Sequence, residues 1–175
     1  RNYCLNYMEN HKTNYKIHTI VLIIALFCLS FNGFAQYSSE INKLLKEVKE
    51  ASFGDSATLF KIGDQTIHKT AQTKYKGAEA EVNIYYANYF YYTRNIDRAK
   101  FYFDKAKLKA QTFSNKHIET LANIRLIFID YELGINEGAE QDFLNLLLET
   151  KQTKDFENHA ELLNLLGIIK ESKNE

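Results

Sequence analysis

The chain has 175 residues, of which 45% are hydrophobic, and its 22 basic residues balance 22 acidic ones. One domain with its own core is the natural expectation for this length, and a neutral chain gives no electrostatic reason to bind nucleic acid or an anionic membrane surface. Proline is absent and there are only 7 glycines, which favours helices, because Pro removes a backbone donor and Gly costs roughly 1 kcal/mol in a helix interior.

Residues 1–35 have the layout of a secretory signal peptide rather than of a folded segment. A weakly basic leader precedes an apolar run over residues 17–31, and the small residues Gly33 and Ala35 stand before an expected cleavage site after Ala35. The run is too short to favour a transmembrane helix, which needs about 20 apolar residues. We therefore predict export to the periplasm or the cell exterior. An uncleaved anchor and a buried core helix are the alternatives.

Residues 1–35 also contain the only methionine of the chain and both of its cysteines. Met8 suits the first residue of the signal peptide, so we expect residues 1–7 to be upstream translation. Cys4 and Cys28 both lie in the leader, so the mature part has no disulfide and no cysteine-based metal site or nucleophile. Lipidation at Cys28 is disfavoured by the bulky Phe27 before it.

The first mature segment, residues 36–79, is expected to form a degenerate leading pair of helices. Its first helix carries one apolar stripe at the spacing i, i+3, i+4 and i+7, made by Ile41, Leu44, Leu45 and Val48. Gly54 is placed to end this helix, and a weaker helical pattern continues to about residue 72.

A stronger helix-pair pattern begins at Ala80. Counted from Ala80, positions 8, 11, 20, 24 and 27 are Ala87, Phe90, Ala99, Phe103 and Ala106. Small residues at positions 8 and 20 let two antiparallel helices approach closely, and the large residue at position 24 fills the neighbouring gap. The pattern returns downstream with Ala139 and Phe143 in place of Ala99 and Phe103, and a second time, after the same interval, with the pair Leu166-Gly167.

This pattern resembles the tetratricopeptide repeat, with its Leu-Gly pair in the first helix and its Ala-x3-Phe spacing in the second. The resemblance implies an all-α fold in which antiparallel helix pairs stack as a right-handed α-solenoid. Here the repeats would cover residues 80–175 with a period of about 40, and the last repeat would be incomplete. Other helix-pair repeats of about 40–47 residues are the alternative.

No pattern in the sequence indicates catalysis. The motifs of nucleotide-binding loops, serine hydrolases and EF-hands are absent. The mature histidines, His68, His117 and His159, are well separated and are interpreted as solvated helix positions. We therefore expect a protein that is not an enzyme and that has no cofactor and no metal site.

An aromatic cluster over residues 85–92 is the best candidate for a binding surface. One helical stripe cannot bury all of these side chains, so some tyrosines must face outward, and tyrosine gives contact area at little entropic cost. The resemblance implies that the first helix of each repeat lines a concave groove for peptides or partner helices. The groove residues would be Asn88, Tyr91, Tyr92, Phe128 and Tyr131. Packing between repeats is the alternative interpretation of the same aromatic residues.

The sequence thus predicts an exported, non-enzymatic scaffold that binds a protein or peptide partner. The alternative is the periplasmic sensory region of a membrane-anchored signalling or transcription regulator, truncated here, with its membrane helix further downstream. The last helix, over residues 155–170, is apolar on several sides. We expect it to be covered by a partner, by a second copy of the chain, or by a continuation of the repeats.

Overall fold

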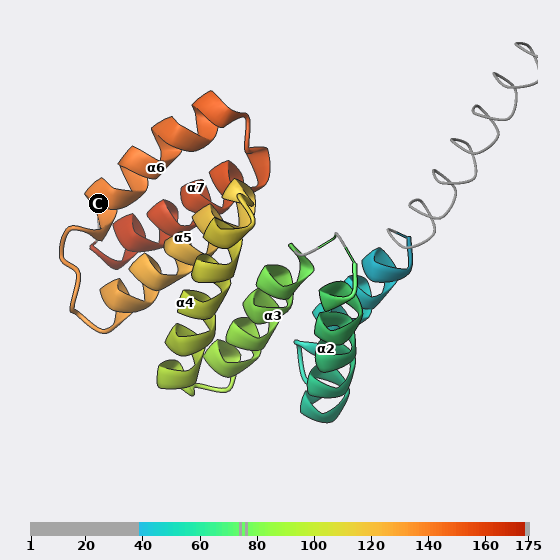
Figure 1. Cartoon of the computed structure of the whole chain (residues 1–175). Coiled ribbons are helices and arrows are strands. Elements are labelled where there is room, and N and C mark those ends of the chain that lie inside the picture. The colour runs from blue at the N-terminus through green and yellow to red at the C-terminus, as the bar shows by residue number, and fades with distance from the viewer. Residues whose placement is uncertain (1–38, 74, 76, 174–175) are drawn as a thin grey trace, which may run out of the picture. The chain divides into compact units, whose positions relative to one another are not determined.

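The computed structural model describes residues 39–73, 75 and 77–173, and every regular element within them is a helix (Figure 1). A first helix covers residues 39–51, and it is followed by α2 (Ser56–Ala71), α3 (Ala78–Tyr92), α4 (Ile96–Thr112), α5 (Lys116–Glu132), α6 (Ala139–Thr153) and α7 (Phe156–Ser172). The prediction of an all-α fold is confirmed for this part of the chain. The predicted signal peptide lies outside the described residues. None of the helices described here is both long and apolar enough to cross a membrane.

Each helix packs against the next, and the odd-numbered helices also contact one another. Consecutive helices are in contact from α2 to α7, and further contacts join α3 to α5 and α5 to α7. By contrast, no Cα atoms of the even-numbered helices α2, α4 and α6 come within 8 Å of one another. Each even-numbered helix therefore packs on odd-numbered neighbours, as Figure 1 shows for α4 between α3 and α5. This arrangement is compatible with a helical repeat fold.

The even-numbered helices bury the same positions at a fixed interval along the chain. These positions form what we call the even-helix stripe: Leu59, Gly63, Thr66 and Thr70 in α2, Ala99, Phe103, Ala106 and Ala110 in α4, and Ala139, Phe143 and Thr150 in α6. The spacing i, i+4, i+7 and i+11 places these residues on one side of a helix. The first helix pair therefore follows the same repeat interval as the later ones.

Equivalent positions also meet across successive interfaces between helix pairs. The rings of Phe60 and Phe90 lie 5.8 Å apart, Lys100 Nζ lies 2.6 Å from an Asp130 carboxylate oxygen, and Lys170 Nζ lies 3.4 Å from a Glu140 carboxylate oxygen. Each pair stands one repeat further along the chain than the previous one. The chemistry changes from aromatic to ionic, and the charges are reversed in the third pair, while the two positions stay in contact. The repeat therefore conserves geometry rather than residue type.

The helix ends recur at half that interval. Arg94, Ser114, Gly134 and Lys154 adopt left-handed φ angles of 55–69°. The residue after each of them, 95, 115, 135 and 155, donates its backbone N–H to the carbonyl five residues earlier, at 2.8–2.9 Å. This is the hydrogen bond of a Schellman ending, which satisfies helix-terminal carbonyl groups. Three of the turns then start the next helix at once, because the side chains of Asn95, Asn115 and Asp155 accept from the backbone N–H three residues on.

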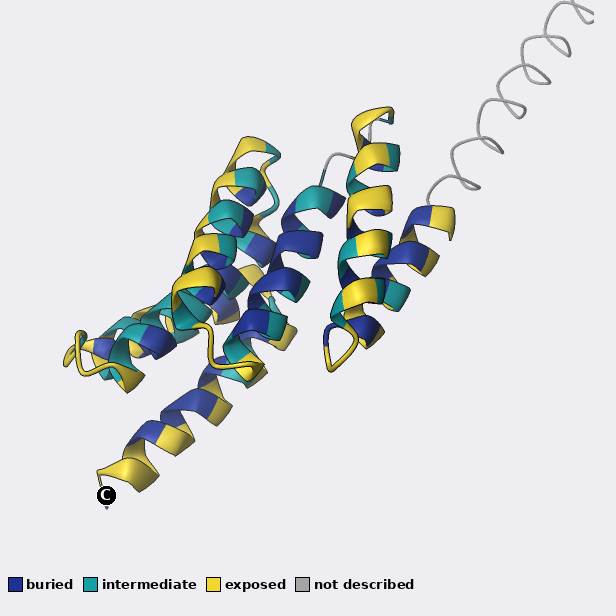
Figure 2. Cartoon of the chain, turned by 90° about the horizontal axis from the view of Figure 1, so that it is seen from below, coloured by how far each residue is buried: buried dark blue, intermediate teal, exposed yellow. Residues whose placement is uncertain are grey.

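The structure encloses seven of the eight residues expected to pack between helices. Ala87, Phe90, Ala99, Phe103, Ala106, Ala139 and Phe143 are all buried. Helix α3 is the most enclosed, with eight of its 15 residues buried, and it is dark blue over most of its surface in Figure 2. Gly167 differs from the expectation: it is exposed, and a Cβ built there would meet no atom within 4 Å. The reason is that no described helix covers this side of α7.

The first helix pair departs from the others at one stripe position. Gly63 stands where Phe103 and Phe143 stand in the later pairs. The ring of Tyr86 from α3 fills the space, because a Cβ on Gly63 would lie 2.1 Å from the Tyr86 hydroxyl oxygen. That hydroxyl donates to the Asp64 carboxylate at 3.0 Å. The large side chain is thus supplied by the following helix instead of by α2.

Candidate functional site

A cleft of about 530 Å³ lies among the first helix, α5 and α7. Its lining residues are Lys49 from the first helix, His117 and Leu121 from α5, and Glu157, Asn158, Ala160, Glu161 and Asn164 from α7. All of them belong to the first helix of a pair, and no even-numbered helix contributes. Six of the eight lining residues have polar or charged side chains, although apolar atoms make up most of the exposed lining of the cleft.

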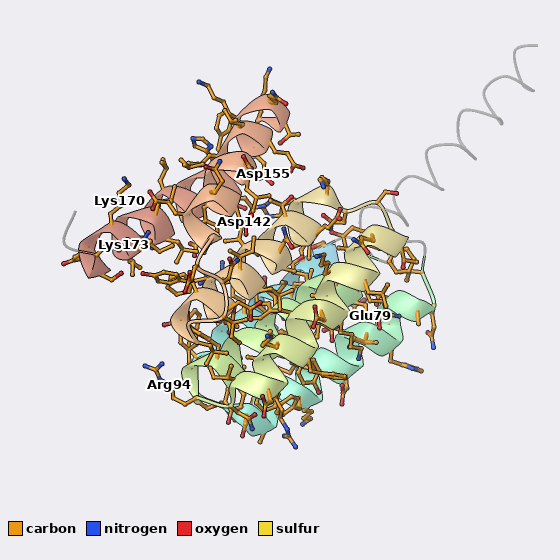
Figure 3. All side chains as sticks on the ribbon, turned by 90° about the vertical axis from the view of Figure 1, so that its left-hand side faces the viewer. Glu79, Arg94, Asp142, Asp155, Lys170 and Lys173 are labelled. Carbon is orange, nitrogen blue, oxygen red and sulfur yellow. The ribbon has the colours of Figure 1, made fainter. Side chains whose placement is uncertain are left out.

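The cleft is fixed by polar contacts between the starts of α5 and α7. Asn158 is 1% exposed, and its amide nitrogen lies 2.8 Å from the His117 carbonyl oxygen and 2.7 Å from an Asp155 carboxylate oxygen. Asp155, labelled in Figure 3, also caps α7 by accepting from the Asn158 backbone N–H. A buried amide is costly unless it is hydrogen-bonded, so these bonds hold the first turn of α7 against α5.

The His117 ring spans two carboxylates at the mouth of the cleft. Its Nδ1 donates to Asp155 at 2.9 Å, because a carboxylate can only accept, and its Nε2 lies 3.4 Å from a Glu157 oxygen. Burial of Asp155 acts to raise its pKa, but hydrogen bonds from His117 and Asn158 outweigh burial and hold the pKa below its usual value. Asp155 therefore keeps its negative charge in this site at neutral pH.

Acidic groups predominate around the cleft. The Glu157 side chain is 88% exposed, while Glu161 is held by Arg125 with an N–O distance of 2.8 Å. On α3, the Tyr85 hydroxyl donates to Glu81 at 2.6 Å. Its pKa is raised, first by burial, then by this bond and by the negative charges of Glu81 and Glu157.

None of the five predicted groove residues lines this cleft. Asn88 and Tyr91 are half-buried, Tyr92 is 54% exposed and stacks on Phe53 at 6.1 Å, and Phe128 is 7% exposed within the core of α5, α6 and α7. Residues 91, 92 and 131 stand in the last turns of α3 and α5, whereas the cleft lies beside the first turns of α5 and α7. Phe128 serves packing and offers no open surface.

Two of the predicted groove tyrosines join neighbouring repeats instead. The Tyr91 hydroxyl donates to Glu132 at 2.6 Å, and the Tyr131 hydroxyl lies 2.6 Å from the Ser172 hydroxyl, with both partners one repeat further along. The Tyr91 pKa is raised by burial and by this bond to Glu132. The outward-facing tyrosines of the sequence interpretation therefore have partners on the next odd-numbered helix.

Sequence reasoning missed the residues that build the cleft, although two signals for them were present. His117 and His159 were interpreted as solvated, yet His117 bonds Asp155 and His159 Nδ1 lies 3.0 Å from the hydroxyl of buried Thr150. An Asp three residues before an Asn at the start of an apolar helix indicates a cap. An amide at the position of Ile118 in the previous repeat indicates a buried polar contact.

No group of three or more His, Cys, Asp or Glu within the described residues could hold a metal ion. At the cleft, Asp155 caps α7 and its bond to His117 joins α7 to α5. Comparison of the chain with protein-family models, with curated proteins and with solved structures found no match.

Proposed function

We propose that this chain is a non-enzymatic scaffold that binds a protein or peptide segment in the cleft between the first helix, α5 and α7. The observation that carries the proposal is the lining of that cleft, which comes entirely from the first helices of the pairs. Stacking of the odd-numbered helices, with α3 on α5 and α5 on α7, supports a continuous binding face. A right-handed solenoid of the tetratricopeptide type is the architecture we propose for the array.

The lining favours an extended segment with a basic side chain. Asn164 is exposed and offers both a donor and an acceptor to a peptide backbone. Glu157 is exposed at the rim, and a basic ligand group beside it would gain a charge-assisted hydrogen bond. Leu121 and Ala160 give a small apolar contact between these polar groups. Export, and a place at the front of a larger signalling protein, remain proposals from the sequence.

The test is selection of peptides from a random display library, followed by measurement of affinity in solution. We expect Asn164→Trp, which fills the cleft from an exposed position, and Glu157→Lys, which reverses the rim charge, each to weaken binding about tenfold or more. Glu171→Lys is the matched control, because Glu171 is also exposed on α7 but does not line the cleft.

Two results would contradict this proposal. One is a failure to select any peptide. The other is binding that survives both cleft substitutions but is lost on Tyr92→Ala, which would move the binding surface to the ends of α3 and α5.

A further inference from the structure

The mouth of the cleft, where α5 meets α7, carries two neighbouring acceptor atoms. His117 Nδ1 donates to Asp155 at 2.9 Å, so the neutral ring holds its one proton on that side and leaves Nε2 as an acceptor. Nε2 lies 3.4 Å from a carboxylate oxygen of Glu157. When the ring is neutral, two acceptors therefore face each other with no proton between them.

Both of these side chains are open to a ligand. The side chain of His117 is 40% exposed and that of Glu157 is 88% exposed, and both residues line the cleft. Glu161, the other carboxylate in the lining, is already held by Arg125 at 2.8 Å. A cationic group that enters the cleft would therefore find its open carboxylate at Glu157.

Protonation of His117 closes the contact between the two acceptors. Nε2 then carries a hydrogen and donates to Glu157 in a charge-assisted hydrogen bond. The ring keeps its bond to Asp155, which is labelled in Figure 3, so the imidazolium spans two carboxylates. An incoming cation would meet the positive charge of the ring and a carboxylate that already has a donor.

We propose that a basic group of the bound segment takes the place of the proton between His117 Nε2 and Glu157, so that ligand and proton compete for one position. The inference rests on the proposed function and adds to it the position of the basic group and the pH dependence of binding. Arginine suits this position, because its guanidinium group can donate one N–H to each acceptor. Binding would weaken as the pH falls through the range in which imidazoles titrate.

The other groups around His117 do not belong to the class that titrates in this range, because only imidazole ordinarily changes charge between pH 5 and 8. On α5, Lys116 Nζ lies 3.5 Å from Glu119 and 3.1 Å from Glu149 of α6. Helices α3 and α4, which also pack on α5, contribute no residue to the lining. The remaining charged groups are Lys49 on the first helix, Arg125 on α5, and Asp155, Glu157 and Glu161 on α7.

The probe is the blocked tripeptide acetyl-Ala-Arg-Ala-amide, and the control ligand has citrulline, which is uncharged and of similar shape, in place of arginine. Amide shifts in NMR spectra of the full chain give the affinity at pH 8 and pH 5.5. We expect the arginine peptide to bind about tenfold more weakly at pH 5.5, the effect of one competing proton on an ordinary imidazole. The citrulline peptide should bind weakly at both values.

The same competition has a second readout on the ring itself. Saturation with the arginine peptide should move the midpoint of the His117 imidazole titration to lower pH by about one unit or more, because the coupling between ligand and proton is reciprocal. This measurement uses the chain without any substitution.

Two histidine variants separate competition at His117 from a general effect of pH on the fold. His117→Asn keeps an amide donor for Asp155 but has no Nε2 and does not titrate, so its affinity should be similar at both pH values. His159→Gln is the matched control, because His159 bonds Thr150 and does not line the cleft. It should keep the tenfold change. Circular dichroism at both pH values checks that each variant is folded.

The inference is overturned by any of four results: no binding of the arginine peptide at pH 8, equal affinity at both pH values, an unchanged imidazole midpoint at saturation, or a tenfold change that persists in His117→Asn. Library selection distinguishes these results from failure of the proposed function. Selected peptides that lack basic residues and bind the cleft equally at both pH values would leave the proposed function standing and remove this inference alone.

Discussion

At the scale of single residues, the helix ends rely on a backbone conformation that the sequence does not favour. The backbone adopts a left-handed φ angle at four evenly spaced positions. Only Gly134 is a glycine, whereas Arg94, Ser114 and Lys154 carry side chains. A left-handed residue with a Cβ costs roughly 1–2 kcal/mol. The Schellman bonds and the caps that follow are therefore strong enough to hold three unfavourable residues in place.

Arg94 and Gly134 are equivalent positions, which makes them a matched test of that cost. Arg94→Gly should raise the free energy of unfolding by about 1 kcal/mol, after allowance for the extra entropy that Gly gains in the unfolded chain. Gly134→Ala should lower it by about 1 kcal/mol for the same reason. Urea unfolding followed by circular dichroism would measure both. Arg94 is exposed (labelled in Figure 3), so Arg94→Ala is the control and should change stability little. If Arg94→Ala stabilised as much as Arg94→Gly, the side chain and not the backbone would be the cause.

At the scale of helices, the contact between α2 and α3 differs from the later repeats in which of its two side chains is large. The helix that carries the small residue in one repeat carries the large residue in the next. Gly63 is buried under the Tyr86 ring, whereas the later repeats place Phe at the first position and Leu at the second, as in Phe103 and Leu126. The two residues should therefore be coupled in stability.

Gly63→Ala should lower the free energy of unfolding by about 2–3 kcal/mol, because its Cβ overlaps the Tyr86 ring in a packed interface. Tyr86→Leu alone should also destabilise, since it leaves a cavity. Combined with Tyr86→Leu, however, Gly63→Ala should cost about 1 kcal/mol or less. The measurement is a double-mutant cycle by urea unfolding. Additive effects would show that Tyr86 moves aside freely, which its bond to Asp64 argues against.

This exchange explains what could and could not be predicted from the sequence. The pattern from Ala99 to Phe103 and from Ala139 to Phe143 indicated helix pairs with a regular period, because small and large residues recur at fixed spacing. The first pair was interpreted as degenerate because Gly63 breaks that pattern, and its compensation by Tyr86 comes from another helix. The cleft depends in the same way on contacts between distant helices, such as that from His117 to Asp155. Local periodicity does not report such contacts.

At the scale of the whole described unit, the core is divided into three clusters joined by shared helices. One cluster joins the first helix, α2 and α3; a second joins α3, α4 and α5; a third joins α5, α6 and α7. Helix α5 has Ile118 and Ala122 in the second cluster and Ile124 and Phe128 in the third. Helices α3 and α5 are thus covered from two sides, while α7 is covered from one. In repeat arrays stability is approximately a sum of such neighbour terms.

Hydrogen exchange should therefore be uneven along the chain. Amides of α3 and α4 should exchange most slowly and those of α7 fastest, because α7 has neighbours on one side only. Leu162→Ala removes a fully buried side chain from the third cluster and should cost about 3 kcal/mol there. It should accelerate exchange in α6 and α7 while leaving α3 nearly unchanged. Leu163→Ala, the exposed neighbour on the same helix, is the control and should have little effect. If Leu162→Ala accelerated exchange equally in every helix, the clusters would unfold as one cooperative unit, and a sum of neighbour terms would be the wrong description of this chain.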